Sequence, residues 1–256
     1  MVDWIAIASG FGVGAVVGMT GVGGGSLMTP LLMTVFRLHP AAAIGTDLWF
    51  AAITKTSGAL AHARQGGVDR AILVRLLAGS LPAALATLGL MALTGVTKAW
   101  ASALGVALGI ALLLTAVTVA YRQAWHAVGL RLERWLPPSR KPALTVAAGA
   151  LLGVLVSLSS IGAGAIGATL ILLLHPRLPA RRLVGTDIAH AVPLTLVAGL
   201  GHAWLGHVEW SLLAVLLVGS IPGIWFGARL VRQMPDRLVR ALLCVSLLTA
   251  GLKVIH

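Results

Sequence analysis

Gly45-Thr46-Asp47 occurs a second time as Gly185-Thr186-Asp187, 140 residues further along the chain. The same interval separates His62 from His202. Recurrence at a fixed interval is typical of an internal repeat, so we expect two copies of one structural unit. Two longer motifs recur in this register without a gap: Gly66-x-Val68-Asp69 as Gly206-x-Val208-Glu209, and Gly79-Ser80-Leu81-Pro82 as Gly219-Ser220-Ile221-Pro222.

Glycine runs lie at matching points of the two copies. Gly21-Val22-Gly23-Gly24-Gly25 in the first copy corresponds to Ile161-Gly162-Ala163-Gly164-Ala165 in the second. Both runs interrupt long apolar segments. A duplicated apolar chain with corresponding helix breaks is typical of secondary transporters, whose binding site lies between the two repeats.

The composition indicates a membrane protein. Of the 256 residues, 58% are hydrophobic and only 10% are charged, and the mean hydropathy is +0.97. The formal net charge of +12 does not indicate nucleic-acid binding, because the basic residues lie in short loops between apolar spans. Cys244 is the single cysteine, which excludes an intrachain disulfide. The sequence has no recognisable catalytic constellation, so we expect no enzyme activity, no cofactor and no metal site.

The hydropathy pattern predicts an all-α polytopic membrane protein. We expect a first transmembrane repeat over 1–120, a cytoplasmic amphipathic linker over 121–141 and a second repeat over 142–256. Two long segments, about 4–36 and 142–176, are each broken by glycine or serine. The remaining spans are expected at about 41–62, 71–93, 98–120, 182–203, 209–230 and 238–255.

The distribution of basic residues predicts the topology. Lysine and arginine are plentiful at 64–75, 122–141, 177–182 and 229–240, so these loops are expected on the cytoplasmic side. Segment 142–176 then starts and ends on one side, which requires two crossings or a re-entrant hairpin. With three further transmembrane helices, each half crosses an odd number of times, so the two repeats are inverted and both termini lie outside the bacterial plasma membrane.

The two breaks are the predicted substrate site. Backbone that leaves a helix inside a membrane must find hydrogen-bond partners, and helix N-termini with free N–H groups suit an anion. An alternative is that the glycines only permit close helix packing. The residues expected to bind substrate at the breaks are Thr20, Gly21, Gly23, Gly24, Gly25 and Ser26 in the first copy, and Ser159, Ser160, Gly162 and Gly164 in the second.

Ionisable residues inside the spans are the remaining candidates, because such residues are costly in a membrane and usually face a cavity or a partner. Lys55 is expected to attract an anionic substrate; the structural alternatives are pairing with Asp47 or extension to the interface. Asp47 and Asp187 are candidates for proton coupling or for helix capping. His190 is a further proton-coupling candidate, with a core histidine as the alternative.

The order and spacing of these motifs resemble the TauE/SafE family of sulfite exporters. The resemblance is carried by Gly21-Val22-Gly23-Gly24-Gly25, Pro30, the stretch Ala43 to Asp47, the second copy and the basic central linker. It implies a transporter of sulfite, sulfonates or related anions, with Thr46 and Thr186 among the binding residues. The second break departs from the first, since Ala163 and Ala165 replace glycines.

We therefore expect a carrier that works by alternating access, with a small anion and the lipid bilayer as its partners and no nucleic acid. A homodimer is left open. Two alternatives also stay open at this stage. One is an anion channel, and the other is a membrane assembly factor that transports nothing.

Overall fold

The computed structural model describes residues 2–20, 25–64, 66–95 and 98–230, with the short pieces 244–245 and 247–248. Throughout these residues the chain is helical or in short connections, which confirms the predicted all-α fold class. The elements are α1 (Val2–Thr20), α2 (Gly25–Thr34), α3 (Pro40–Arg64), α4 (Arg70–Thr94), α5 (Lys98–Ala120), α6 (Arg122–Trp135), η1 (Pro138–Arg140), α7 (Lys141–Ser159), α8 (Ala165–Leu174), α9 (Ala180–Trp204) and α10 (Trp210–Leu230).

Five stretches of the described chain are long and apolar enough to cross a membrane: Arg70–Thr94, Ser102–Ala120, Pro138–Ser159, Ala180–Trp204 and Trp210–Gly227. Large apolar side chains on these helices are exposed, as expected for contact with lipid; Leu93 is 88% and Trp225 is 69% exposed. Helix α3 has the length of a span with 25 residues, but Asp47 and Lys55 make it less apolar. The span predicted at 238–255 lies almost wholly outside the described residues.

The broken segment of the second half folds back on itself. Helix α7 has 19 residues and α8 has 10. The hydroxyl of Thr145, near the start of α7, hydrogen-bonds to Nε2 of His175 at the end of α8, over 3.1 Å. The second arm therefore returns beside the first arm. At 1.5 Å per residue α8 is only about 15 Å long, half of the hydrocarbon thickness.

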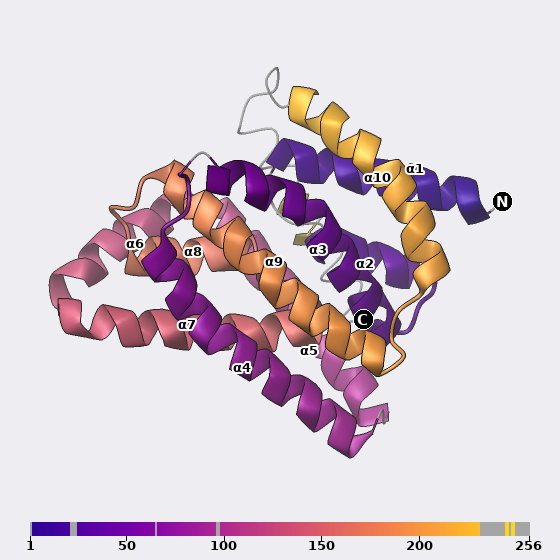
Figure 1. The fold of residues 1–256 in the computed structure, drawn as a ribbon, viewed down its shortest axis with the longest axis horizontal. Helices are drawn as coiled ribbons and strands as arrows, with labels where there is room; N and C mark the ends of the chain where they lie inside the picture. The colour runs from indigo at the N-terminus through magenta and orange to yellow at the C-terminus, as the bar shows by residue number, and fades with distance from the viewer. Residues whose placement is uncertain are drawn as a thin grey trace.

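Helix pairing links the two halves of the sequence. The first helix of each half packs along the fourth helix of the other half, so α1 pairs with α10 and α4 pairs with α7. The corresponding helices α3 and α9 pair with each other and run side by side through the middle of the molecule (Figure 1). In the view of Figure 1, α1 and α10 lie above that central pair and α4 lies below it.

Glycine permits the close approach of these helices. A Cβ atom at Gly79 would lie 1.9 Å from the carbonyl oxygen of Val146, and one at Gly153 would lie 2.3 Å from that of Ser80. The corresponding pair is equally close, since a Cβ at Gly14 would lie 2.5 Å from the carbonyl oxygen of Ser220. Close helix packing, which was the alternative role for the glycines of the breaks, is therefore observed for glycines that lie within the helices α1, α4 and α7.

We expect Gly79→Ala to destabilise the protein by about 1–3 kcal/mol, because the added methyl group must force α4 away from α7. The measurement is the free energy of unfolding in detergent micelles. Gly89→Ala in the same helix is the matched control, since no atom beyond its chain neighbours and its own helix backbone lies within 4 Å of that Cβ position. The control should be neutral or stabilising, because alanine is the better helix former. Equal effects of the two substitutions would contradict the packing argument.

Candidate functional site

The centre of the molecule is the antiparallel pair α3 and α9. Near the start of α3, the hydroxyl of Thr46 accepts a hydrogen bond from the backbone N–H of Glu209, just after α9, over 3.0 Å. At the other end, the hydroxyl of Thr186 accepts from the N–H of Asp69, just after α3, over 2.8 Å. The two bonds correspond in the repeat. Thr46 of the first half bonds to the residue before α10, and Thr186 of the second half bonds to the residue before α4. Thr46 and Thr186, which the resemblance places in the binding site, therefore have hydrogen-bonding roles between the halves.

Lys55 is a buried cation between the halves. Its side chain is only 9% exposed, and Nζ donates a hydrogen bond of 2.6 Å to the carbonyl oxygen of Ala163 in the second break. The ammonium also interacts electrostatically with Asp47 and Asp187, although no direct ion pair joins it to either in the part of the chain that the structure describes. The charged end of Lys55 therefore lies against the second break, and its extension to the membrane interface stays an untested alternative.

The second break has an unusual backbone. Ser160, Gly162 and Gly164 have φ angles of 58°, 132° and 144°, a region that residues with a side chain rarely adopt. This conformation turns the carbonyl of Ala163 towards Lys55. Ser159 is occupied locally, because its hydroxyl donates to the carbonyl oxygen of Leu155 over 2.6 Å.

Asp187 lies at the N-terminus of α8. The backbone N–H of Gly164, the residue that caps this helix, bonds to the carboxylate, and a Cβ atom at Gly167 would lie 2.3 Å from Oδ1 of Asp187. A carboxylate is stabilised at this end of a helix by the free N–H groups and the helix dipole. The position predicted for a substrate anion thus already has a carboxylate beside it.

Asp47 has a corresponding place in the first half. It is fully buried, and its Oδ2 accepts a hydrogen bond from the hydroxyl of Thr29 in α2. The hydroxyl of Ser160 lies close to the same carboxylate. Since Asp47 is in the third turn of α3, it does not cap that helix, and the capping alternative is wrong for its own helix.

Among the described residues, several buried polar side-chain atoms have no hydrogen-bond partner. Buried polar groups are normally hydrogen-bonded, so a cluster of exceptions needs an explanation such as a bound ligand or water. Among the described residues, these atoms include one carboxylate oxygen of each aspartate, the hydroxyls of Ser157 and Ser160, and Nδ1 of His190.

His190 breaks the correspondence between the halves. Its Nε2 hydrogen-bonds to the hydroxyl of Ser80 over 2.9 Å. The residue at the corresponding position of the first half is Phe50, and the hydroxyl of Ser220, which corresponds to Ser80, has no hydrogen-bond partner. At this position, therefore, the second half has a titratable side chain and the first half has none.

The first break lies largely outside the described residues. Gly21, Gly23 and Gly24 fall in the undescribed stretch 21–24, Thr20 ends α1, and Gly25 begins α2. Ser26 is buried. The substrate roles predicted for these residues remain predictions.

Sequence reasoning missed some residues that the structure brings to this region. Thr29 and Gly167 contact the two aspartates, yet neither stands out in an apolar helix. Ser80 could have been found, because it belongs to the repeated Gly-Ser-x-Pro motif. His202, which the sequence marks only as the repeat partner of His62, is fully buried, with Nε2 2.9 Å from the carbonyl oxygen of Ser157.

The arrangement brings a cation, two acids and several hydroxyls together in the buried interior. Lysine and hydroxyl groups can replace the hydration shell of an oxyanion, while the carboxylates and the imidazole can take up or release protons. Such groups are costly in a membrane interior and mark transport pathways and proton relays.

Several known proteins are similar to this chain over most of its length. The model of the family described as "Sulfite exporter TauE/SafE" matches residues 6–254. A "Probable membrane transporter protein YjnA" of Bacillus subtilis (strain 168) is 38% identical over 252 residues, covering 97% of this chain and 98% of that protein. A "Probable membrane transporter protein" of Xylella fastidiosa (strain Temecula1) is 28% identical, covering 90% of this chain and 85% of that protein. No solved structure matches the chain.

We expect Gly167→Ala and Asp187→Ala to be energetically coupled, because the severe clash of the added methyl group is with the carboxylate, 2.3 Å away, and without it the tightest remaining approach is 3.2 Å, to the carbonyl oxygen of Gly162. The double variant should lose less unfolding free energy than the two single variants lose in total. The difference should be about 1 kcal/mol or more, within the range for residues in contact. Unfolding free energies in detergent give this cycle. Gly105→Ala, which has open space around its Cβ, should combine additively with Asp187→Ala; additivity in both cycles would contradict the contact.

Proposed function

Because the chain belongs to the TauE/SafE sulfite exporter family of membrane transporters, we propose that it is a secondary transporter of small anions, with sulfite and organosulfonates as the substrate class. The observation that carries the proposal is Lys55. This cation comes from the first half, donates its hydrogen bond to the break of the second half, and lies within electrostatic reach of a carboxylate from each half.

Alternating access in this proposal is a motion of one repeat against the other. The antiparallel course of the corresponding helices α3 and α9 supports an inverted repeat, as do the exchanged pairs α1 with α10 and α4 with α7. Inverted repeats place the substrate near the midplane at the repeat interface, where rocking exposes it to each side in turn.

The anion would bind beside Lys55 at the second break. The hydroxyl of Ser160 and the backbone N–H groups after it are the donors, and the ammonium would exchange its bond to the Ala163 carbonyl for one to the substrate. The first break, from Thr20 to Ser26, would contribute hydroxyl and N–H groups from the other side.

Proton coupling follows from the charges around the site. Asp47, Asp187 and Lys55 together carry one net negative charge when all are ionised, which opposes entry of an anion. A proton taken up by Asp47, Asp187 or His190 removes that opposition, so a proton would enter with the substrate. We place the carrier in a bacterial plasma membrane with both termini outside, as the distribution of basic residues indicates.

The decisive assay is counterflow of labelled sulfite in proteoliposomes, with taurine, sulfoacetate, thiosulfate and sulfate as competitors. The proposal expects saturable exchange that at least one of these competitors blocks. Flux without saturation or counterflow would instead establish a channel. Folded protein that exchanges none of them would contradict the substrate class.

We expect Lys55→Ala to reduce exchange about tenfold or more, because a charge-assisted hydrogen bond is worth about 1.5–3 kcal/mol. Initial exchange rates in proteoliposomes measure the effect. Arg131→Ala, at an exposed position of α6, removes one positive charge outside the site and serves as the control. An unchanged rate in folded Lys55→Ala protein would remove this lysine from the mechanism.

We also expect Asp187→Asn to abolish the response of transport to an imposed pH gradient, because the amide cannot carry the coupling proton. Counterflow, which needs no net proton movement, should be reduced less. Glu209→Gln, an exposed position that bonds through its backbone, is the control and should keep the full response. A pH-gradient response that survives in the Asp187 variant would exclude this residue as the proton carrier.

A further inference from the structure

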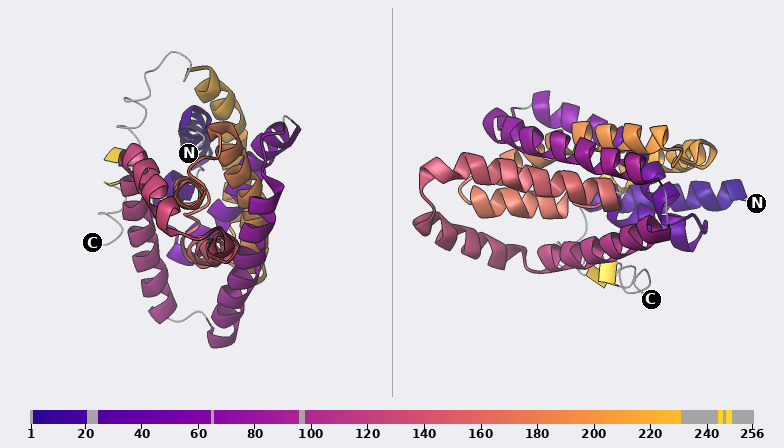
Figure 2. Two further views of the ribbon diagram at one scale, coloured as in Figure 1. Left: turned by 90° about the vertical axis from the view of Figure 1, so that its left-hand side faces the viewer. Right: turned by 90° about the horizontal axis from the view of Figure 1, so that it is seen from below.

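Helix α6 is attached to the end of the α7–α8 hairpin. Gly129 is the buried residue of α6, and a Cβ atom there would lie 2.9 Å from the carbonyl oxygen of Leu172. The ring of His126 hydrogen-bonds through Nε2 to the carbonyl oxygen of Pro176 over 3.1 Å. Both contacts fix the linker helix against α8 and the turn that follows it, at the end of the molecule away from the N-terminus (Figure 2).

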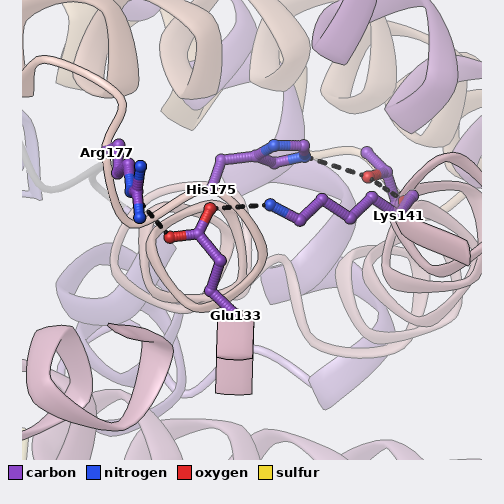
Figure 3. Close-up of polar contacts among 5 residues, drawn as sticks. Glu133, Lys141, His175 and Arg177 are labelled. Atoms are coloured by element: carbon purple, nitrogen blue, oxygen red, sulfur yellow. Dashed lines mark hydrogen bonds and ion pairs between the residues drawn. The ribbon is translucent and has the colours of Figure 1, made fainter. Parts of the chain in front are cut away.

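Glu133 joins two cations at this place. Its Oε1 accepts from Nζ of Lys141 over 2.8 Å, and its Oε2 accepts from Nε of Arg177 over 2.9 Å (Figure 3). The hydrogen bond from Lys141, with the charges of both cations, holds the pKa of Glu133 below its usual range. The carboxylate therefore stays ionised at neutral pH and positions both cations.

The cations keep donors for a second anion. An ammonium has three N–H donors and a guanidinium has five, and one carboxylate uses only one of each here. The Arg177 side chain is 82% exposed. Glu133 is also the single acidic residue among 122–141 and 177–182, which contain eight lysines and arginines. The surface consequently has a large excess of positive charge.

These side chains line a pocket of about 630 Å³. Its walls include Arg134, Trp135 and the prolines 137 and 138, in addition to Glu133, Lys141 and Arg177. Three cations thus surround one carboxylate in a hollow large enough for a phosphate group and its neighbouring atoms.

The position of the pocket at the end of a candidate membrane span favours a lipid as its occupant. A candidate span begins at Pro138, so the pocket lies where the hydrocarbon ends and the headgroups begin. Trp135 is 87% exposed, and tryptophan at a span end is typical of the membrane interface. Basic pockets beside transmembrane helices at this level bind anionic headgroups.

We propose that this pocket binds the phosphate of an anionic phospholipid, with Lys141 and Arg177 as the positively charged ligands and Trp135 beside the headgroup. Glu133 holds both cations in place in the absence of lipid. This inference is independent of the transported substrate.

The test is lipid titration of the full-length protein in detergent, with bound lipid counted by native mass spectrometry. Phosphatidylglycerol should bind in preference to phosphatidylcholine. The double variant Lys141→Gln/Arg177→Gln should lose roughly fivefold in that preference for each cation removed. Arg70→Gln, an exposed arginine at the start of α4, is the matched control and should keep the preference.

Two measurements on the unmodified protein keep the test independent of folding of the variants. The preference should disappear at about 1 M salt, where the Debye length is about 3 Å, and glycerol 3-phosphate should not compete at concentrations that saturate the lipid. Equal binding of the two lipids, or an unchanged preference in folded double variant, would overturn the proposal. Competition by glycerol 3-phosphate at those concentrations would show a soluble phosphate ligand instead.

Discussion

The hydrogen bond from Lys55 to the carbonyl of Ala163 is the constraint around which the centre of this protein is arranged. An ammonium removed from water costs several kcal/mol unless strong partners replace its hydration. Here the partners are a backbone carbonyl in the second half and the electrostatic influence of Asp47 and Asp187. The carbonyl is available only because positive φ angles at Ser160, Gly162 and Gly164 interrupt the helix beside it.

The packing of the remaining helices keeps these groups together. Corresponding helices of the two halves meet at α3 and α9, while the outer pairs exchange partners between the halves. Glycines such as Gly79 and Gly153 bring backbones into contact and so fix the outer pairs. The central pair is joined by side chains instead, through Thr46 and Thr186 at its two ends.

The sequence predicted the helices well because apolar spans and basic loops are set by local composition. Helices α3, α4, α9 and α10 begin and end within a few residues of the predicted spans, and α7 ends at the serine-glycine break. The site was only partly predictable. Asp47, Lys55 and Asp187 stand out as charges in apolar helices, but Thr29 and Gly167 gain importance only through residues 18 and 20 positions away. The spacing of apolar residues along one helix does not show which residues of another helix pack against it.

The central claim is that the two halves are inverted around the Lys55 site. Arg70 and Trp210 are the first residues of α4 and α10 and correspond in the repeat. The direct measurement introduces Arg70→Cys or Trp210→Cys into protein whose single cysteine is replaced by Cys244→Ser, and labels each from one side of the membrane with an impermeant thiol reagent. The account predicts that Arg70→Cys reacts only from the cytoplasmic side and Trp210→Cys only from the opposite side. Labelling of both positions from the same side would contradict it.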